Sequence, residues 1–437
     1  MQTIRLTLWG FLIGASGLWL MAANWPETWS YFQFRDLINQ YSGLIAMGAM
    51  SLCMLLAVRP MWLESWLHGL DKGYRLHKWL GITALISTLA HFWFTKGTKW
   101  MIGWGWLERP QRQRRFAGNA DGPLDVEHWL GSFRSVAEDI GEWAFYLVLV
   151  LLAMALVKQI PYHWFKKWHK WLAAAYLALV FHAVILVKFE YWSHPIGWLF
   201  ALLLIAGTVS AGITLLNRIG ATRKTLGTVA SIQPLTQSES VDLHLEVPHW
   251  AGHQAGQFVF IRSLGENQEA HPFTLASATA PLRVLIKHLG DYTAHSAHYF
   301  QAGTPVEIEG PYGCFTFEDS AKTQIWIAAG IGITPFIARL EKLATTENTQ
   351  PIFLFYCYRN ADKRLLAELQ QKAALANVQL ILWNSTHQGH LNAIEIQQRV
   401  GNLSNSSAWF CGNRQFGEQL KATLPVAQFH QELFEMR

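Results

Sequence analysis

Four histidines in the first half of the chain lie in two apolar stretches, with two histidines in each. The stretch "RLHKWLGITALISTLAHF" carries His77 and His91, which are fourteen positions apart. The stretch "HKWLAAAYLALVFHAVILV" carries His169 and His182, which are thirteen positions apart. At about 1.5 Å per helical residue, each pair is separated by roughly 20 Å along its helix. Ionisable residues inside a membrane helix are costly and usually functional, so these side chains are the first candidates for a site.

If both helices run in the same direction, His77 and His169 share one depth, and His91 and His182 share another. We call them the inner pair and the outer pair, respectively. Two facing imidazoles are the axial ligands that a haem iron accepts, and the apolar haem ring fits between helices. The pattern predicts two b-type haems, because the chain has no CxxCH attachment motif. The alternative is that buried histidines hydrogen-bond between helices.

The spacing in the second stretch does not fit one straight helix. Fourteen residues return an ideal helix to within about 40° of the same face, whereas thirteen leave it about 140° away. We therefore expect bending, tilt or different rotamers in the helix that carries His169 and His182.

The composition indicates a membrane protein with a soluble part. The chain has 437 residues, enough for two or three domains, and its 51% hydrophobic and 15% charged residues are unusual for a soluble protein. Eighteen of the 22 tryptophans precede residue 200. The net charge of +5 is clustered at the ends of apolar runs, which favours membrane flanks over nucleic acid as the partner. Four cysteines without a CxxC motif argue against a cysteine-ligated metal site or a disulfide framework.

Six apolar runs each approach the ~20 residues that a membrane-spanning helix needs. With six spans both termini share one side, and most basic flanks favour the cytoplasm for that side. The basic stretch "RPQRQRR" in the loop 96–140 would lie outside and does not fit this rule. The alternative for the first run is a cleaved secretory signal. The runs cover, roughly, residues 6–24, 41–58, 76–94, 141–157, 169–187 and 196–216.

The pattern changes after residue 220. Short alternating stretches such as "VDLHLEV" and "GQFVFIR" predict an antiparallel β-barrel over residues 221–318. Residues 319–437 alternate apolar strands with helical stretches, which predicts a parallel α/β domain. We therefore expect an α-helical bundle of six transmembrane helices (residues 1–220) in the plasma (inner) membrane, followed by two cytoplasmic domains.

Two motifs in the predicted barrel suit a flavin. In "HPFTLAS", backbone amides and the Thr274 hydroxyl are placed to hydrogen-bond an isoalloxazine ring. In "LIKHLGDYTAHSA", Lys287 precedes a turn that opens a helix, and a helix N-terminus with a nearby cation suits a pyrophosphate. Ordinary turn chemistry is the alternative for either motif.

Three features of the α/β domain suit a nicotinamide dinucleotide. In "AAGIGITPFIARL", Gly330 and Gly332 permit close approach to a phosphate, and Pro335 fits the first turn of a helix. Arg359 ends the second strand, where an arginine accepts a 2′-phosphate, so it favours NADPH, with NADH as the alternative. Cys411 ends a later strand near the expected nicotinamide. The alternatives are surface charge for Arg359 and core packing for Cys411.

Together these motifs resemble the NADPH oxidase and ferric reductase family over nearly the whole chain. The resemblance implies six helices with two b-type haems, then a ferredoxin-reductase-like FAD barrel and an NADPH domain. It also implies that Phe434, in the closing "FHQELFEMR", covers the flavin until nicotinamide displaces it. By the same resemblance, the haem ligands are His77, His91, His169 and His182; the FAD site comprises His271, Pro272, Phe273, Thr274, Lys287 and Thr293; and the NADPH site comprises Gly330, Gly332, Thr334, Pro335, Arg359, Cys411 and Gly412.

One departure bears on the electron acceptor. Members that produce superoxide often have a further histidine one turn beyond the outer ligand of the third span. Here Thr95 holds that position, Lys96 follows it, and the predicted second span contains no arginine. The departure counts against molecular oxygen as the acceptor, although the edge of an outer haem can leak electrons to oxygen.

The sequence thus predicts a transmembrane oxidoreductase. Electrons pass from cytoplasmic NADPH through FAD, the inner haem and the outer haem to ferric iron or molecular oxygen across the membrane. Thr274, Cys411 and Phe434 are expected to act at the flavin. Two alternatives are an electron donor to a partner protein or quinone, and a non-enzymatic transport or sensor protein with a regulatory flavin domain.

Overall fold

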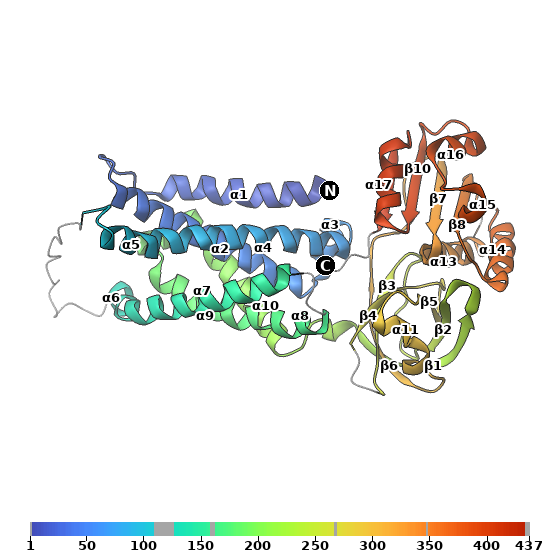
Figure 1. Cartoon of the computed structure of the whole chain (residues 1–437), viewed down its shortest axis with the longest axis horizontal. Helices are drawn as coiled ribbons and strands as arrows, with labels where there is room; N and C mark the ends of the chain where they lie inside the picture. Colours follow the sequence, from blue (N-terminus) through green and yellow to red (C-terminus); the bar gives the residue numbers. More distant parts are fainter. Residues whose placement is uncertain (1, 109–125, 158–161, 266–268, 347, 433–437) are drawn as a thin grey trace. The chain divides into compact units, whose positions relative to one another are not determined.

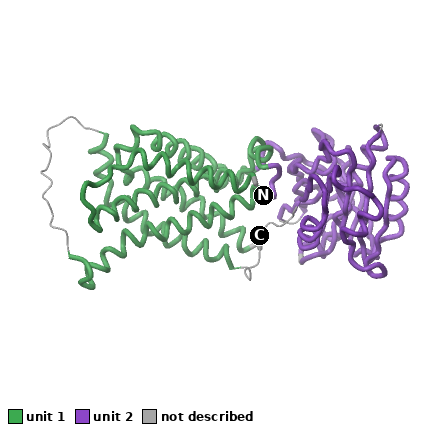
Figure 2. Tube along the Cα trace, turned by 90° about the horizontal axis from the view of Figure 1, so that it is seen from above, with its two compact units in different colours: residues 1–67, 72–219 green, residues 68–71, 220–437 purple. Residues whose placement is uncertain are grey.

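The computed structural model describes residues 2–108, 126–157, 162–265, 269–346 and 348–432 (Figure 1). The chain forms two compact units, coloured separately in Figure 2. The first comprises the residues up to 67 and residues 72–219, and the second comprises residues 68–71 and 220–437.

Helices make up the first unit, and its long helices lie side by side (Figure 1). A π-helical turn at Trp93–Gly97 follows the fourth helix, and a 3₁₀ turn at Phe189–Ser193 precedes the last. The α-helices are α1 (Gln2–Ala22), α2 (Tyr31–Ala57), α3 (Met61–Leu67), α4 (Leu70–Phe92), α5 (Thr98–Gly103), α6 (Val126–Ser132), α7 (Arg134–Leu156), α8 (Tyr162–His169), α9 (Trp171–Leu186) and α10 (Pro195–Leu215).

Five stretches of the described helices are long and apolar enough to cross a membrane: residues 3–22, 31–57, 134–156, 164–186 and 195–215. The predicted third span lies in α4, which is also long but carries Arg75, Lys78 and two histidines. These polar residues make α4 less apolar than the other five. Its apolar side nevertheless packs in the bundle, where Leu80 and Ala84 share a core with Ala49 of α2.

Helix α2 begins ten residues earlier than the predicted run at 41. Ser30 caps it: its hydroxyl accepts the Gln33 amide, and the Gln33 side chain accepts the Ser30 amide. This reciprocal cap fixes the start of a helix regardless of hydropathy. The extension places Arg35 inside α2, so the prediction of no arginine in the second span is wrong. Arg35 donates a hydrogen bond to the Phe94 carbonyl, at 2.8 Å.

Large apolar side chains face outward from the bundle. Trp62, Trp66, Trp143 and Trp198 are each more than 60% exposed. Exposed apolar surface on this scale marks contact with something other than water, and tryptophans are typical of membrane interfaces. The first unit is therefore shaped for a bilayer.

The second unit opens with six antiparallel strands in the order β4-β3-β6-β1-β2-β5. An antiparallel bridge between Leu275 and Val284 joins the two edges of this sheet, and the Ala276 amide donates to the Arg283 carbonyl at 2.7 Å beside it. The sheet therefore curls into the predicted barrel. Its strands are β1 (Lys224–Leu235), β2 (Ser240–Glu246), β3 (Phe258–Ser263), β4 (His271–Thr274), β5 (Leu282–Lys287) and β6 (Pro305–Tyr312), with short helices α11 (Asp291–Ala294) and α12 (Ser296–Tyr299).

A parallel five-stranded sheet in the order β11-β10-β7-β8-β9 completes the unit. Helices α13 and α14 cover the face that contains Trp326, whereas α16 and α17 cover the face that contains Ile327. The fold class predicted from the sequence is thus confirmed. The elements are β7 (Thr323–Ala329), α13 (Thr334–Leu343), β8 (Ile352–Tyr358), α14 (Lys363–Leu375), β9 (Gln379–Asn384), α15 (Ser385–Gln388), α16 (Ala393–Val400), β10 (Ser406–Cys411), α17 (Arg414–Thr423) and β11 (Gln428–Glu432).

Barrel and parallel sheet share one core and one ion network. Phe315 and Phe317, which follow the barrel, pack with Trp326, Phe336 and Trp409 of the sheet domain. Since these side chains are nearly inaccessible to water, the two domains are held together by apolar burial.

The ion network centres on Arg283 of β5, whose side chain is 11% exposed. Its guanidinium donates to both oxygens of Asp242 on β2, at 2.9 and 2.7 Å, and also to Glu368 on α14. Burial alone would raise the pKa of Glu368, but hydrogen bonding to Arg283 and the Lys372 charge outweigh it and lower that pKa. The arginine therefore links the barrel to the α/β domain.

Arg283→Met should destabilise the second unit by about 3–5 kcal/mol, because it removes the cation that binds both oxygens of Asp242 and leaves Glu368 with Lys372 alone. Urea titration of the full chain, followed by flavin release, would measure the loss. Arg414→Met removes the exposed Arg414–Glu418 pair of α17 and should cost less than about 1 kcal/mol. Equal midpoints for the two variants would contradict a linking role for Arg283.

Candidate functional site

The structure brings the four membrane histidines together in the two expected pairs. The ring centres of His77 and His169 lie 6.1 Å apart, and those of His91 and His182 lie 6.2 Å apart. A metal–imidazole bond is about 2 Å long, so the centres of two imidazoles on opposite sides of one metal lie about 6 Å apart. Each pair therefore has the separation that one iron between the rings requires.

Hydrogen bonds orient three of the four imidazoles. The Nδ1 atoms of His77, His91 and His182 lie 3.1, 3.0 and 2.8 Å from the backbone carbonyl oxygens of Cys53, Asn39 and Ala137, respectively. A carbonyl oxygen can only accept, so each Nδ1 carries the proton and each Nε2 has a free lone pair. Histidines that bind a metal usually donate their other N–H in this way.

Two buried polar atoms near the pairs have no hydrogen-bond partner within the described part of the chain. They are Nδ1 of His169 and the Thr88 hydroxyl, which lies eleven residues after His77 on α4. Eleven residues make just over three full turns, so Thr88 shares the histidine-bearing face of its helix. Unsatisfied buried polar atoms are rare in folded proteins, and their presence fits a bundle that accepts a polar-edged group.

A local tightening of the helix at Lys170 bears on the thirteen-residue spacing, although the Lys170 backbone keeps helical φ and ψ angles of −57° and −32°. α8 ends at His169, a turn at Lys170 follows, and α9 begins at Trp171. The Ala173 amide donates to the Lys170 carbonyl at 3.0 Å, a tighter bond than the regular helical one. A tighter turn rotates the chain further per residue than a regular helix does, which brings His169 and His182 closer to a common face.

The two predicted flavin motifs meet in the barrel. His271 and Thr274 are the ends of β4, which pairs with β3 and includes Pro272 and the buried Phe273. The His271 ring stacks on the Tyr292 ring, with centres 3.7 Å apart, and Tyr292 is the second residue of α11. Lys287 ends β5, which precedes the same turn.

The Thr293 hydroxyl has a local role in this turn. It accepts the amides of Leu289 and Gly290, at 2.9 and 3.1 Å, and donates to the Gly290 carbonyl at 3.1 Å. Thr293 therefore fixes the backbone of the turn.

Tyr292 is the residue of this region that the sequence analysis missed. Its hydroxyl, His288 Nε2 and the Ser296 hydroxyl are all buried without a hydrogen-bond partner among the residues described. Burial raises the pKa of Tyr292, so its hydroxyl remains a protonated donor. Three unsatisfied polar atoms within nine residues mark a place that fits a polar ligand. The tyrosine in "GDYT" was the available signal.

The nucleotide motifs meet at the carboxyl edge of the parallel sheet. β7 lies between β10 and β8, so the chain reverses its direction of strand addition beside β7, and ligands of open α/β sheets bind at such points. The turn Gly330–Ile333 follows β7, and a Cβ on Gly332 would lie 2.2 Å from the Cys411 carbonyl oxygen. Gly412 also lacks room, since its Cβ would meet that of Ala329 at 2.6 Å. The glycines at positions 332 and 412 therefore let the turn after β7 approach the loop after β10.

Helix α13 begins at this turn. Pro335 occupies its first turn, and the Thr334 hydroxyl donates to the Ile331 carbonyl at 2.6 Å. Both residues are buried, so they support the glycine turn from the interior of the domain.

Cys411 lies at the end of β10, with Glu432 opposite it on β11. Burial and, second, the charge of Glu432 raise the pKa of the Cys411 thiol. A buried protonated thiol is a poor nucleophile, so Cys411 is suited to lining a pocket by shape.

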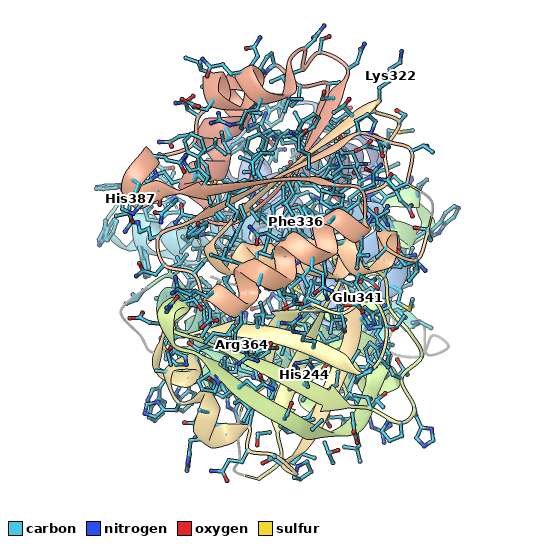
Figure 3. The ribbon with its side chains drawn as sticks, turned by 90° about the vertical axis from the view of Figure 1, so that its right-hand side faces the viewer. His244, Lys322, Phe336, Glu341, Arg364 and His387 are labelled. Atoms are coloured by element: carbon cyan, nitrogen blue, oxygen red, sulfur yellow. The ribbon has the colours of Figure 1, made fainter. Side chains whose placement is uncertain are left out.

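Arg359 and Arg364 differ in their surroundings. Arg364 donates to Gln233 of the barrel at 2.7 Å, and Figure 3 shows Arg364 and Glu341 on the side of the α/β domain next to the barrel. Arg359 is exposed after β8, with no ion pair or hydrogen bond to any residue described. Its charge is therefore free for a ligand. Phe434 lies outside the described residues.

Three family models match consecutive parts of the chain. The ferric reductase like transmembrane component matches residues 42–180, an FAD-binding domain matches residues 227–316, and an oxidoreductase NAD-binding domain matches residues 326–421. The first match contains all four paired histidines, and the other two contain the flavin and nucleotide motifs.

Curated relatives match shorter segments. NADPH oxidase 1 of Mus musculus is 31% identical over 166 residues, which is 31% of this chain and 28% of the relative. The mitochondrial ferric reduction oxidase 3 of Arabidopsis thaliana is 28% identical over 153 residues, which is 33% of this chain and 20% of the relative. The alignments thus span less than a third of either relative. With the three matched models in this order on one chain, the protein belongs to the NADPH oxidase and ferric reductase family.

Proposed function

We propose that this chain is a transmembrane oxidoreductase that passes electrons from cytoplasmic NADPH, through FAD and two b-type haems, to ferric iron or molecular oxygen across the membrane. The observation that carries the proposal is the pair of matched imidazole separations, 6.1 and 6.2 Å, in a bundle fused to FAD- and NAD-binding domains. His77 and His169 would hold the inner haem, and His91 and His182 the outer one. When bound, these groups supply hydride acceptance, release of single electrons and a path across the bilayer.

The membrane residues of the chain hold and orient the haems. Carbonyls of α2 and α7 fix the tautomers of His77, His91 and His182, which keeps each Nε2 directed away from the helix backbone. Apolar side chains of α2, α9 and α10 exclude water around them. The plasma (inner) membrane is the proposed location, with the second unit in the cytoplasm.

The soluble residues bind and position the two-electron donor and its acceptor. Backbone and side-chain groups of His271–Thr274 would orient the flavin ring, with the Thr274 hydroxyl as a hydrogen-bond partner, and Lys287 would face the pyrophosphate. The turn at Gly330–Ile333 and the start of α13 would hold the dinucleotide phosphates. Cys411 and Gly412 would shape the nicotinamide pocket, and Phe434 would cover the flavin until nicotinamide displaces it. The proposed domains are residues 1–220, 221–318 and 319–437.

Absorbance spectra of the purified full chain, recorded without oxygen before and after NADPH addition, test the proposal. A bis-imidazole haem protein should show its low-spin spectrum and become reduced by NADPH. A transport or sensor protein with a regulatory flavin would show no haem reduction.

His91→Ala or His182→Ala should remove the outer haem, about half of the haem in the protein, while NADPH still reduces the flavin. The expected cause is loss of one axial ligand, measured as haem per flavin. His194→Ala is a matched control, because His194 is exposed before α10. Full haem content in both variants would refute the ligand assignment.

Arg359→Ala should raise the KM for NADPH by about tenfold, or ~1.4 kcal/mol, and leave kcat and the KM for NADH nearly unchanged. The reason is that only binding of the 2′-phosphate is lost. Arg364→Ala serves as the control, since its guanidinium is held by Gln233. Steady-state kinetics with both coenzymes decide the matter, and an unchanged NADPH/NADH preference would mean that Arg359 is surface charge.

A further inference from the structure

The outer pair differs from the inner pair in what lies beside its rings. A carbonyl inside a helix already accepts the amide four residues later, so a side chain that also binds this carbonyl must pass beside that later residue. For the Ala137 carbonyl, which accepts from His182, the later residue is Gly141. For the Asn39 carbonyl, which accepts from His91, it is Gly43.

Gly141 leaves the space that the His182 ring occupies. A Cβ built on Gly141 would lie 2.0 Å from Nδ1, 2.3 Å from Cε1 and 2.8 Å from Cγ of His182. No side chain fits at such distances without moving the imidazole. A Cβ on Gly43 would lie 3.4 Å from Nδ1 and Cε1 of His91, which is close but ordinary contact. Both rings of the outer pair thus rest against helix glycines, and the fit is tighter at Gly141.

The inner pair lacks this arrangement. The Cys53 carbonyl accepts from His77, and the residue four positions later is Ala57. Nδ1 of His169 has no partner among the described residues. The glycine contacts are therefore specific to the outer pair.

Among the described helix glycines of the bundle, only Gly43 and Gly141 would meet a histidine ring; Gly48 and Gly207 would instead meet the rings of Phe11 and Tyr176. A Cβ on Gly81 of α4, or on Gly212 of α10, would meet no atom within 4 Å. Glycine in a helix interior normally makes the helix less stable than alanine would. A glycine that also contacts a histidine ring has a steric reason to be there.

We propose that Gly141 is a positioning residue for the outer haem, with Gly43 as its weaker counterpart on α2. The absent side chain lets His182 approach α7 closely enough to donate Nδ1–H to Ala137, which fixes the ring plane and leaves Nε2 toward His91. This inference rests on the proposed function. It adds that ligation at the outer site depends on backbone acceptors that glycines keep accessible.

Gly141→Ala should act like His182→Ala at the outer site and leave the inner site intact. The purified full-length protein should lose about half of its haem, and the low-spin EPR signal that disappears should be the one missing in His182→Ala. Flavin content and flavin reduction by NADPH should equal those of wild type, which reports correct folding. Gly81→Ala is the matched control in the same bundle and should retain both signals.

Gly43→Ala gives a second, milder measurement. Its methyl group should fit, so both haems should remain, while the g values or the midpoint potential of the outer signal shift from those of wild type. This variant decides the question if Gly141→Ala does not fold. The inference would be overturned if Gly141→Ala retained both haems with wild-type spectra. If only Gly43→Ala folds, wild-type spectra in that variant would overturn it. A wild-type protein without haem would instead refute the proposed function.

Discussion

A neutral imidazole in an apolar bundle must place its N–H on an acceptor, and in this protein the acceptors are helix carbonyls. α2 supplies two of them in antiparallel register with α4: Asn39 meets His91, and Cys53 meets His77. The acceptors are fourteen residues apart, as are the histidines. The depth of both pairs is thus set by how α2 and α4 are aligned. α7 supplies the third acceptor, at Ala137.

The pairing of the histidines and the glycine turn between β7 and α13 could be predicted from the sequence, because both depend on local spacing. A separation of fourteen residues is a whole number of helical turns to within about 40°, so a common face follows from geometry alone. The tight turn at Lys170 could not be predicted in this way. Neither glycine nor proline marks it, and it matters only because His169 and His182 both pair with histidines of α4.

Two further features escaped prediction for related reasons. The start of α2 at Tyr31 depends on a capping interaction between Ser30 and Gln33, whereas hydropathy locates only the apolar part of a helix. Tyr292 belongs to the candidate site because the fold brings β4, which carries His271, next to α11, so that the two rings stack. Local motifs identified both segments, but their contact is a property of the closed barrel.

The modest hydropathy of α4 has a consequence for how the protein is made. During synthesis a helix partitions into the bilayer according to its own apolar content, and Arg75, Lys78 and two histidines count against α4. α2 is synthesised first and offers the carbonyls that satisfy His77 and His91. α4 is therefore the segment of the bundle whose retention in the membrane depends most on a helix already inserted. Biogenesis of the bundle is then cooperative, with α2 acting as the template for α4.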